Sequence, residues 1–170
     1  AMARDWIMLE FLDGGDSTKN APNENSGREW FELFALGVDN GYTQADIVQA
    51  AKAFTGYRTR SNAGGWQEIT FDTSRHDPNA KTLFGVTIPA QNVTDDYAAV
   101  VDITIDNRAV AEFICTKLFE HFCYEGPSDL PIAAMAAQLR ADGYELAPLL
   151  KTLFKSEAFF SSRAKAGLAK

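Results

Sequence analysis

Three charged residues in one predicted helix could carry chemistry. Arg28, Glu29 and Glu32 fall within one arc of about 100° on the helix expected over residues 25–36. The rest of this helix is apolar almost all round, which predicts a buried helix whose charges are not freely solvated. Two carboxylates could serve acid–base catalysis while the guanidinium holds an anionic group. We favour the structural alternative, a buried ion pair that fixes how the helices pack.

A second candidate is the adjacent pair His76 and Asp77, with Lys81 at the end of the same loop. The pair could act as a general base or contribute metal ligands. Because a metal site needs more ligands than these, the metal stays unassigned. We favour an Asx turn at Asp77 and a backbone hydrogen bond at His76. The enzyme hypothesis unites both groups, as catalytic residues His76, Asp77, Glu29 and Glu32 and ligand-binding residues Arg28 and Lys81.

Two asparagines lie at the start of the charged helix, where a polar loop over residues 16–25 leads into it. Asn23 and Asn25 are therefore further candidate ligand-binding residues. Helix capping is the alternative that we favour, because asparagine is strongly preferred at the N-cap.

The elements that must position these residues are mostly helical. After Gly37 and Gly41, Thr43 with Asp46 three residues later indicates a capping box, and Gly56 indicates the end of that helix. Residues 66–73 and 81–88 are predicted to form two strands that pair with each other, with the His76 loop between them. Further helical patterns cover residues 3–12, 94–105, 107–122, 128–143 and 145–154. Thr94 is predicted to cap the second of these, with Asp95 and Asp96 in its first turn, and Asp106 or Asn107 to cap the third.

These patterns predict a mainly α fold of one domain over residues 1–170. We expect a helical bundle-like, orthogonal packing, with one small β-hairpin near residues 66–88. A chain of 170 residues with 46% hydrophobic and 12% aromatic residues can bury a substantial core.

Composition narrows the possible partners. The net charge is −7 and no lysine- or arginine-rich run occurs, so nucleic acid is a poor partner. We expect no transmembrane segment, because no charge-free run of about 18 apolar residues is present. The N-terminus lacks the basic start and apolar core of a signal peptide. No nucleophile elbow, phosphate-binding glycine loop or paired zinc motif occurs, so a cofactor stays unassigned.

The chain has two cysteines, Cys115 and Cys123, eight residues apart in one predicted helix. Along the helix axis they would stand about 12 Å apart, beyond the roughly 7 Å that a disulfide tolerates. We expect two free thiols that behave as small core residues.

Three strings carry a family resemblance: NENSGREWFELFALGV, GYTQADIVQAAKAFTGY and HDPNAKTLFG. They resemble the bacterial family called domain of unknown function 1800, and the similarity continues more loosely to about Phe160. The positions on the family's pattern are Asn23, Glu24, Asn25, Arg28, Glu29, Glu32, Leu33, Leu36, Gly37, Tyr42, Thr43, Asp46, Thr55, Gly56, His76, Asp77, Lys81 and Gly85. The departures are Ser26-Gly27, Trp30, Ala35, Lys52 and Tyr57.

The family has no agreed biochemical function, so the resemblance leaves three hypotheses. We prefer a binding or scaffold module of an exported or envelope-associated bacterial protein. The alternatives are a hydrolase-like or metal-assisted enzyme and a purely structural packing unit. The resemblance implies a periplasmic or secreted location, an exported protein or polysaccharide as partner, and a longer natural chain of which this is a central-to-C-terminal part. The oligomeric state stays unassigned.

Overall fold

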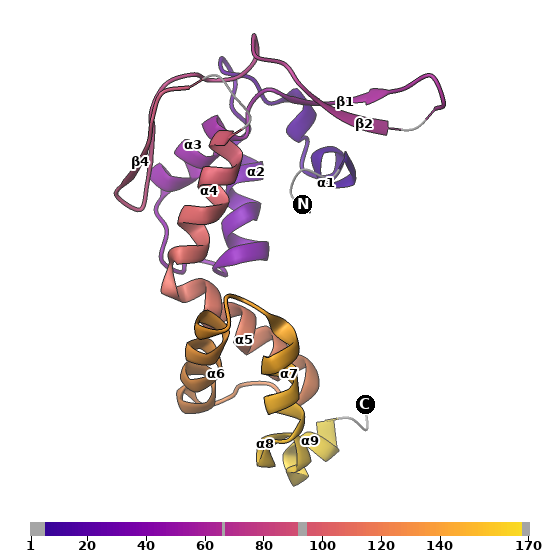
Figure 1. Ribbon diagram of the computed structural model, residues 1–170, viewed down its shortest axis with the longest axis vertical. Helices are drawn as coiled ribbons and strands as arrows, with labels where there is room; N and C mark the ends of the chain where they lie inside the picture. The colour runs from indigo at the N-terminus through magenta and orange to yellow at the C-terminus, as the bar shows by residue number, and fades with distance from the viewer. Residues whose placement is uncertain (1–5, 66, 92–94, 168–170) are drawn as a thin grey trace. The chain divides into compact units, whose positions relative to one another are not determined.

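The computed structural model describes residues 6–65, 67–91 and 95–167. The chain is mainly helical, as predicted, and its strands form two small antiparallel pairs (Figure 1). It divides into two compact units, Ala1–Asp106 and Asn107–Lys170, which are described separately. Within the described residues, each helix is too short or too polar to cross a bilayer.

The first unit begins with short helices and ends with a longer one. Its elements are α1 (Trp6–Phe11), the 3-10 turn η2 (Gly14–Asp16), α2 (Glu24–Glu29), the π-helix η3 (Trp30–Ala35), α3 (Gln44–Ala53), β1 (Tyr57–Ser61), β2 (Gln67–Phe71), β3 (Lys81–Leu83), β4 (Val86–Ile88) and α4 (Asp95–Asp106). The helix expected over residues 3–12 is seen from Trp6 onward. Thr94, predicted as an N-cap, and Trp66, predicted to open a strand, lie outside the described residues.

Helix α3 is the centre of this unit and contacts α2, β3 and α4. The predicted capping box is confirmed: Thr43 Oγ1 accepts from the Asp46 N–H, and Asp46 Oδ2 accepts from the Thr43 N–H at 2.8 Å. Helix α2 approaches α3 so closely that a Cβ on Gly27 would lie 2.7 Å from the Ile47 carbonyl oxygen. A side chain at Gly27 would therefore push the two helices apart.

The predicted helix over residues 25–36 changes type at Trp30, where the α-helix becomes a π-helix. The Leu36 N–H donates to the Phe31 carbonyl, five residues back, at 2.7 Å. A π turn holds more residues than an α turn, so the spacing used to predict the buried faces no longer applies. Phe31 and Leu36 are fully buried as expected, but Leu33 is 53% exposed and its predicted burial is wrong.

The predicted pairing of residues 66–73 with 81–88 is also wrong. Strand β1 pairs with β2, and β3 pairs with β4, in two hairpins. Phe84 and Gly85 both have positive φ, 49° and 80°, which is the pattern of a type I′ turn and lets β3 fold directly onto β4. The His76 loop therefore connects two hairpins and is not the turn of one.

The second unit is helical throughout its described part. Its elements are α5 (Arg108–Phe122), α6 (Asp129–Ala141), α7 (Leu146–Phe154), α8 (Glu157–Phe160) and α9 (Ser162–Gly167). Asn107, one of the two residues predicted to cap this helix, is the N-cap of α5 and accepts from the Ala109 N–H at 3.0 Å. Helix α6 packs against α5 and α7 around an apolar core. Both cysteines are free and buried here, and burial raises the pKa of Cys115 to about 11.

Candidate functional site

His76 and Lys81 meet at one buried carboxylate, that of Asp96 in the first turn of α4. Lys81 Nζ donates to Asp96 Oδ2, and His76 Nε2 lies 3.2 Å from the same oxygen. Gln91 Nε2 donates to the other oxygen, Oδ1, at 2.7 Å. The His76, Lys81 and Asp96 side chains are 0–1% exposed. We call these three residues the buried polar cluster.

Lys81 makes three hydrogen bonds in this cluster. Besides Asp96, Lys81 Nζ donates to the carbonyl oxygens of Asp77 and Asn79, at 2.5 and 2.8 Å. The three hydrogen-bonding positions of its terminal nitrogen thus have three acceptors. These hydrogen bonds link the loop of residues 77–79 to Asp96 of α4.

The histidine is oriented by Thr55, which follows the C-cap of α3. His76 Nδ1 lies 2.9 Å from the Thr55 carbonyl oxygen, which can only accept, so Nδ1 carries the hydrogen. The Thr55 hydroxyl donates to the Lys52 carbonyl at 2.6 Å and accepts from the Asp77 N–H at 2.9 Å. Thr55, His76 and Asp96 have the residue types of a nucleophile–base–acid triad. The Thr55 hydroxyl hydrogen, however, points to a carbonyl and not to the imidazole.

Close packing fixes the position of the histidine. Gly56 has a φ of 93°, and a Cβ there would lie 3.0 Å from the His76 Cβ and 3.0 Å from the Phe71 ring. The Phe71 and His76 ring centroids are 5.1 Å apart. His76 Nε2 has no aligned hydrogen bond within the described residues, despite its short contact with Asp96.

The charged residues of the predicted helix form a different, partly exposed network. Arg28 Nη1 lies 3.6 Å from Glu32 Oε1, and the side chains are 39% and 19% exposed. Arg28 Nη2 also donates to Gln44 Oε1 at 2.9 Å, and Tyr42 donates to Glu32 Oε1 at 3.1 Å. The predicted burial of this cluster is therefore only partial.

The tyrosine in this network stays a hydrogen-bond donor. Its pKa is raised, first by burial and further by the neighbouring carboxylate of Glu32, although the Asp39 N–H that donates to the phenol oxygen acts in the opposite direction. Glu29 is half-buried. No hydrogen bond or ion pair of the described residues joins Glu29 or Glu32 to His76.

Asn23 is the N-cap of α2, the alternative that we favoured from the sequence. Its Oδ1 accepts from the N–H groups of Asn25 and Ser26, at 3.0 and 3.4 Å. Its Nδ2 donates to the carbonyls of Leu12 and Asp13, at 2.7 and 3.1 Å, and so ties the segment after α1 to the start of α2. The Asn25 side chain is exposed.

The candidate residues do not converge on a metal site in the part of the chain that the structure describes. No group of three or more His, Cys, Asp or Glu side chains lies there in an arrangement that could hold an ion.

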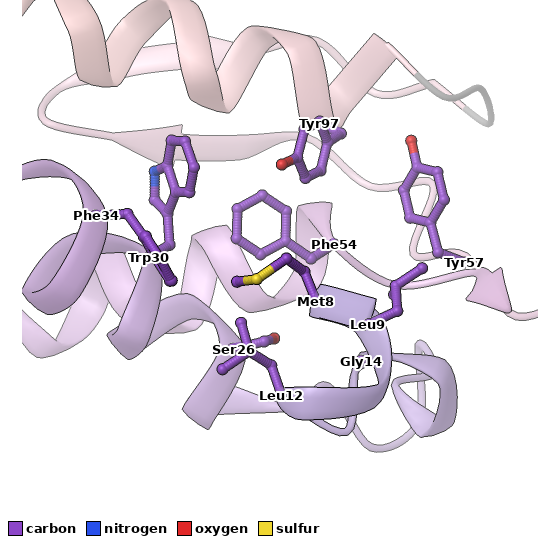
Figure 2. Close-up of a pocket in the computed structure, with 10 residues that line it drawn as sticks. All are labelled: Met8, Leu9, Leu12, Gly14, Ser26, Trp30, Phe34, Phe54, Tyr57 and Tyr97. Carbon is purple, nitrogen blue, oxygen red and sulfur yellow. The ribbon is translucent and has the colours of Figure 1, made fainter. Parts of the chain in front are cut away.

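An apolar pocket with a volume of about 50 Å³ opens in the same unit (Figure 2). It is lined by Met8, Leu9, Leu12, Gly14, Ser26, Trp30, Phe34, Phe54, Tyr57 and Tyr97. The π-helix contributes Trp30 and Phe34, four residues apart, to one wall. Trp30 Nε1 donates to Thr104 at 3.2 Å, and Ser26 Oγ donates to the Asn23 carbonyl at 2.8 Å, so these two polar groups already have partners. We call this site the apolar pocket.

Sequence reasoning missed Asp96 and the pocket. The sequence pattern explains Asp96 only as an acidic residue that the helix dipole favours in the first turn of α4. One available signal was that Lys81 and Leu83, two residues apart on β3, must share a face, so a buried lysine needed a partner. The pocket aromatics, such as Trp30 and Phe54, follow the same periodicity as core residues, which gives no sign of an opening.

Comparison with known proteins gives one family. No curated protein and no solved structure matches the chain. The sequence model of the family described as "Protein of unknown function (DUF1800)" matches residues 1–170, the whole chain. The family's pattern includes two residues of the buried polar cluster, His76 and Lys81, and also Thr43, Asp46 and Gly56. The protein belongs to the DUF1800 family.

Proposed function

We propose that this chain is a binding module that receives an apolar group of a partner in the apolar pocket. The observation that carries the proposal is the open pocket itself, built partly on a π-helix, a rare element found frequently at functional sites. Its lining is apolar and its walls are preformed, which is how ligand sites are usually built. A volume of about 50 Å³ suits the branched tip of one aliphatic side chain.

The alternative of a hydrolase-like enzyme has weaker support. Its strongest residues, His76 and Lys81, are buried with Asp96, where no substrate reaches them in this conformation. A general base must come within hydrogen-bond reach of the proton that it removes. The remaining carboxylates, Glu29 and Glu32, lie in a separate network in which Glu32 is paired with Arg28.

The experiment is a titration with N-acetyl-leucinamide, followed by two-dimensional NMR. We expect saturable shifts of the Trp30 indole N–H and of backbone amides beside Phe34 and Tyr97. N-acetyl-glycinamide, which lacks the side chain, should give none.

Two variants of α1 make a matched pair for this titration. Met8→Trp places an indole in the pocket and should abolish the shifts. Ile7→Trp adds the same side chain at an exposed neighbouring position outside the pocket lining and should leave them intact. If N-acetyl-leucinamide shifts no pocket resonance in the unaltered protein, the binding proposal is wrong and the purely structural packing unit takes its place.

The family resemblance supports two additions to this proposal, the cellular location and the type of partner. We propose an exported or envelope-associated bacterial protein as the natural context, with an exported protein ahead of a polysaccharide as the partner. Fractionation of the source cells with an antibody to this chain tests the location, and recovery only in the cytoplasm would refute it.

A further inference from the structure

A second, polar pocket of about 240 Å³ adjoins the apolar pocket. It is lined by Leu9, Glu10, Asp13, Gly15, Asp16, Arg58 and Thr59. The lining thus contains three carboxylates and one guanidinium, and Arg58 is itself paired with Asp72 at 3.8 Å. Within the described part of the chain, no hydrogen bond or ion pair occupies the carboxylates of Glu10, Asp13 and Asp16. We call this site the acidic pocket.

The linings of the two pockets have Leu9 in common. Along the α1 segment, Met8, Leu9 and Leu12 line the apolar pocket, whereas Leu9, Glu10 and Asp13 line the acidic pocket. At the start of β1, which contacts both α1 and η2, successive residues also line different pockets. Tyr57 faces the apolar pocket, and Arg58 the acidic one. A ligand with an apolar group beside a cation would therefore contact both pockets at once.

The acidic wall is held in place before any ligand binds. Asp13 has a positive φ of 51°, and its carbonyl accepts from Asn23 Nδ2 at 3.1 Å. Asn23 also holds the Leu12 carbonyl and caps α2. Because this segment is fixed by a side chain of another element, binding need not order it first, and a preorganised site binds more tightly.

The exposed side of α1 indicates the size of the ligand. Trp6, Ile7 and Phe11 are 41%, 57% and 70% exposed, so apolar surface extends well beyond the pocket. Exposed apolar side chains that lie close together can mark a protein interaction site. A small ligand that fills the apolar pocket would leave Phe11 in water, whereas a polypeptide could cover it.

Resting on the proposed function, we propose that the partner is a polypeptide segment in which a leucine-like side chain is followed by lysine or arginine. The apolar side chain occupies the apolar pocket, and its basic neighbour lies among Glu10, Asp13 and Asp16. Charge complementarity selects this class of segment, because the acidic pocket repels acidic segments and attracts basic ones. The chain's net charge of −7 acts in the same direction.

The test uses three capped tetrapeptides that differ at two central positions: leucine–arginine, leucine–glutamate and alanine–arginine. Binding is followed by NMR at the Trp30 indole N–H. At low salt we expect the leucine–arginine peptide to bind roughly ten-fold more tightly than the leucine–glutamate peptide. The alanine–arginine peptide should bind weakly. Raising the salt to roughly 0.5 M should reduce the difference, since exposed charges are then screened.

A charge-neutral triple variant, Glu10→Gln with Asp13→Asn and Asp16→Asn, isolates the acidic pocket. Asparagine tolerates the positive φ of Asp13, so the fold should persist. The triple variant should bind both leucine peptides equally. A control variant with the same change in charge, Asp39→Asn with Glu68→Gln and Glu145→Gln, alters exposed carboxylates outside both pockets and should keep the ten-fold preference.

Different results would contradict this inference and the proposed function. If the triple variant keeps the full preference for arginine, the inference is wrong while binding in the apolar pocket stands. If N-acetyl-leucinamide and every peptide leave the pocket resonances unmoved, the proposed function itself fails. If tetramethylammonium binds as tightly as the leucine–arginine peptide and depends equally on the three carboxylates, a small cation replaces the polypeptide as the ligand.

Discussion

The buried polar cluster and the apolar pocket lie next to each other in the chain but differ in solvent access. Thr55 and Asp96 hold the cluster, while their direct neighbours Phe54 and Tyr97 line the pocket. The cluster has groups that could do chemistry but no access, and the pocket has access but no reactive groups. From this difference we propose that His76 and its partners support the pocket wall.

The largest expected effect comes from breaking the cluster. Lys81→Met leaves the Asp96 carboxylate buried without its cation, and breaking one side of a buried pair costs about 3–5 kcal/mol of unfolding free energy. Urea unfolding followed by tryptophan fluorescence measures the loss. All three tryptophans, Trp6, Trp30 and Trp66, belong to the first unit, so this signal reports that unit alone.

Two further variants keep this prediction decisive. Lys19→Met removes an exposed cation and should change stability by no more than about 0.5 kcal/mol. The double variant Lys81→Met with Asp96→Leu replaces the pair by apolar groups and should recover part of the loss, with a coupling of roughly 0.5–3 kcal/mol. If the double variant loses as much unfolding free energy as the two single variants lose together, the two residues are not coupled. The pair would then not hold the pocket wall.

The next effect concerns Thr55, which joins the end of α3 to the His76 loop. Thr55→Val removes the acceptor of the buried Asp77 N–H at nearly constant volume, and an unsatisfied buried donor costs about 1–3 kcal/mol. The same urea experiment applies, with the exposed Thr82→Val as the matched control. A loss below about 0.5 kcal/mol would show that the loop is held by its lysine contacts alone.

Local signals predicted much of the fold. The capping box at Thr43, the Asn107 cap and the end of α3 near Gly56 each depend on residues within a few positions, and all were correct. The mainly helical character and the two free cysteines followed from periodicity and helix rise.

Features that depend on long-range contacts were missed. Pairing of Lys81 with Asp96 spans 15 residues, and nothing in the helix pattern around Asp96 reveals that partner. The strand pairing was wrong because the two-residue turn places Phe84 at positive φ, which is uncommon for a bulky residue. The π-helix shifted Leu33 to the surface, since a single insertion in helical periodicity leaves no local mark in the sequence.

The smallest effect on stability is expected at the pocket. Met8 is half-buried and borders open space, so Met8→Ala should reduce the unfolding free energy by about 1 kcal/mol or less. Its main consequence is for the ligand. A wider pocket should admit a larger group, so binding of N-acetyl-phenylalaninamide should strengthen relative to N-acetyl-leucinamide. NMR titration of both compounds against both proteins measures the change in preference.

This last prediction also tests whether the two regions are separable. If Met8→Ala lowers stability as much as Lys81→Met does, the pocket wall is part of the core, and its opening is a packing defect with no binding role. If stability is nearly unchanged and the preference shifts toward the larger compound, the site binds by shape. Substitutions in the pocket lining would then leave the buried polar cluster intact, because Met8 belongs to α1 and takes no part in the hydrogen bonds of that cluster.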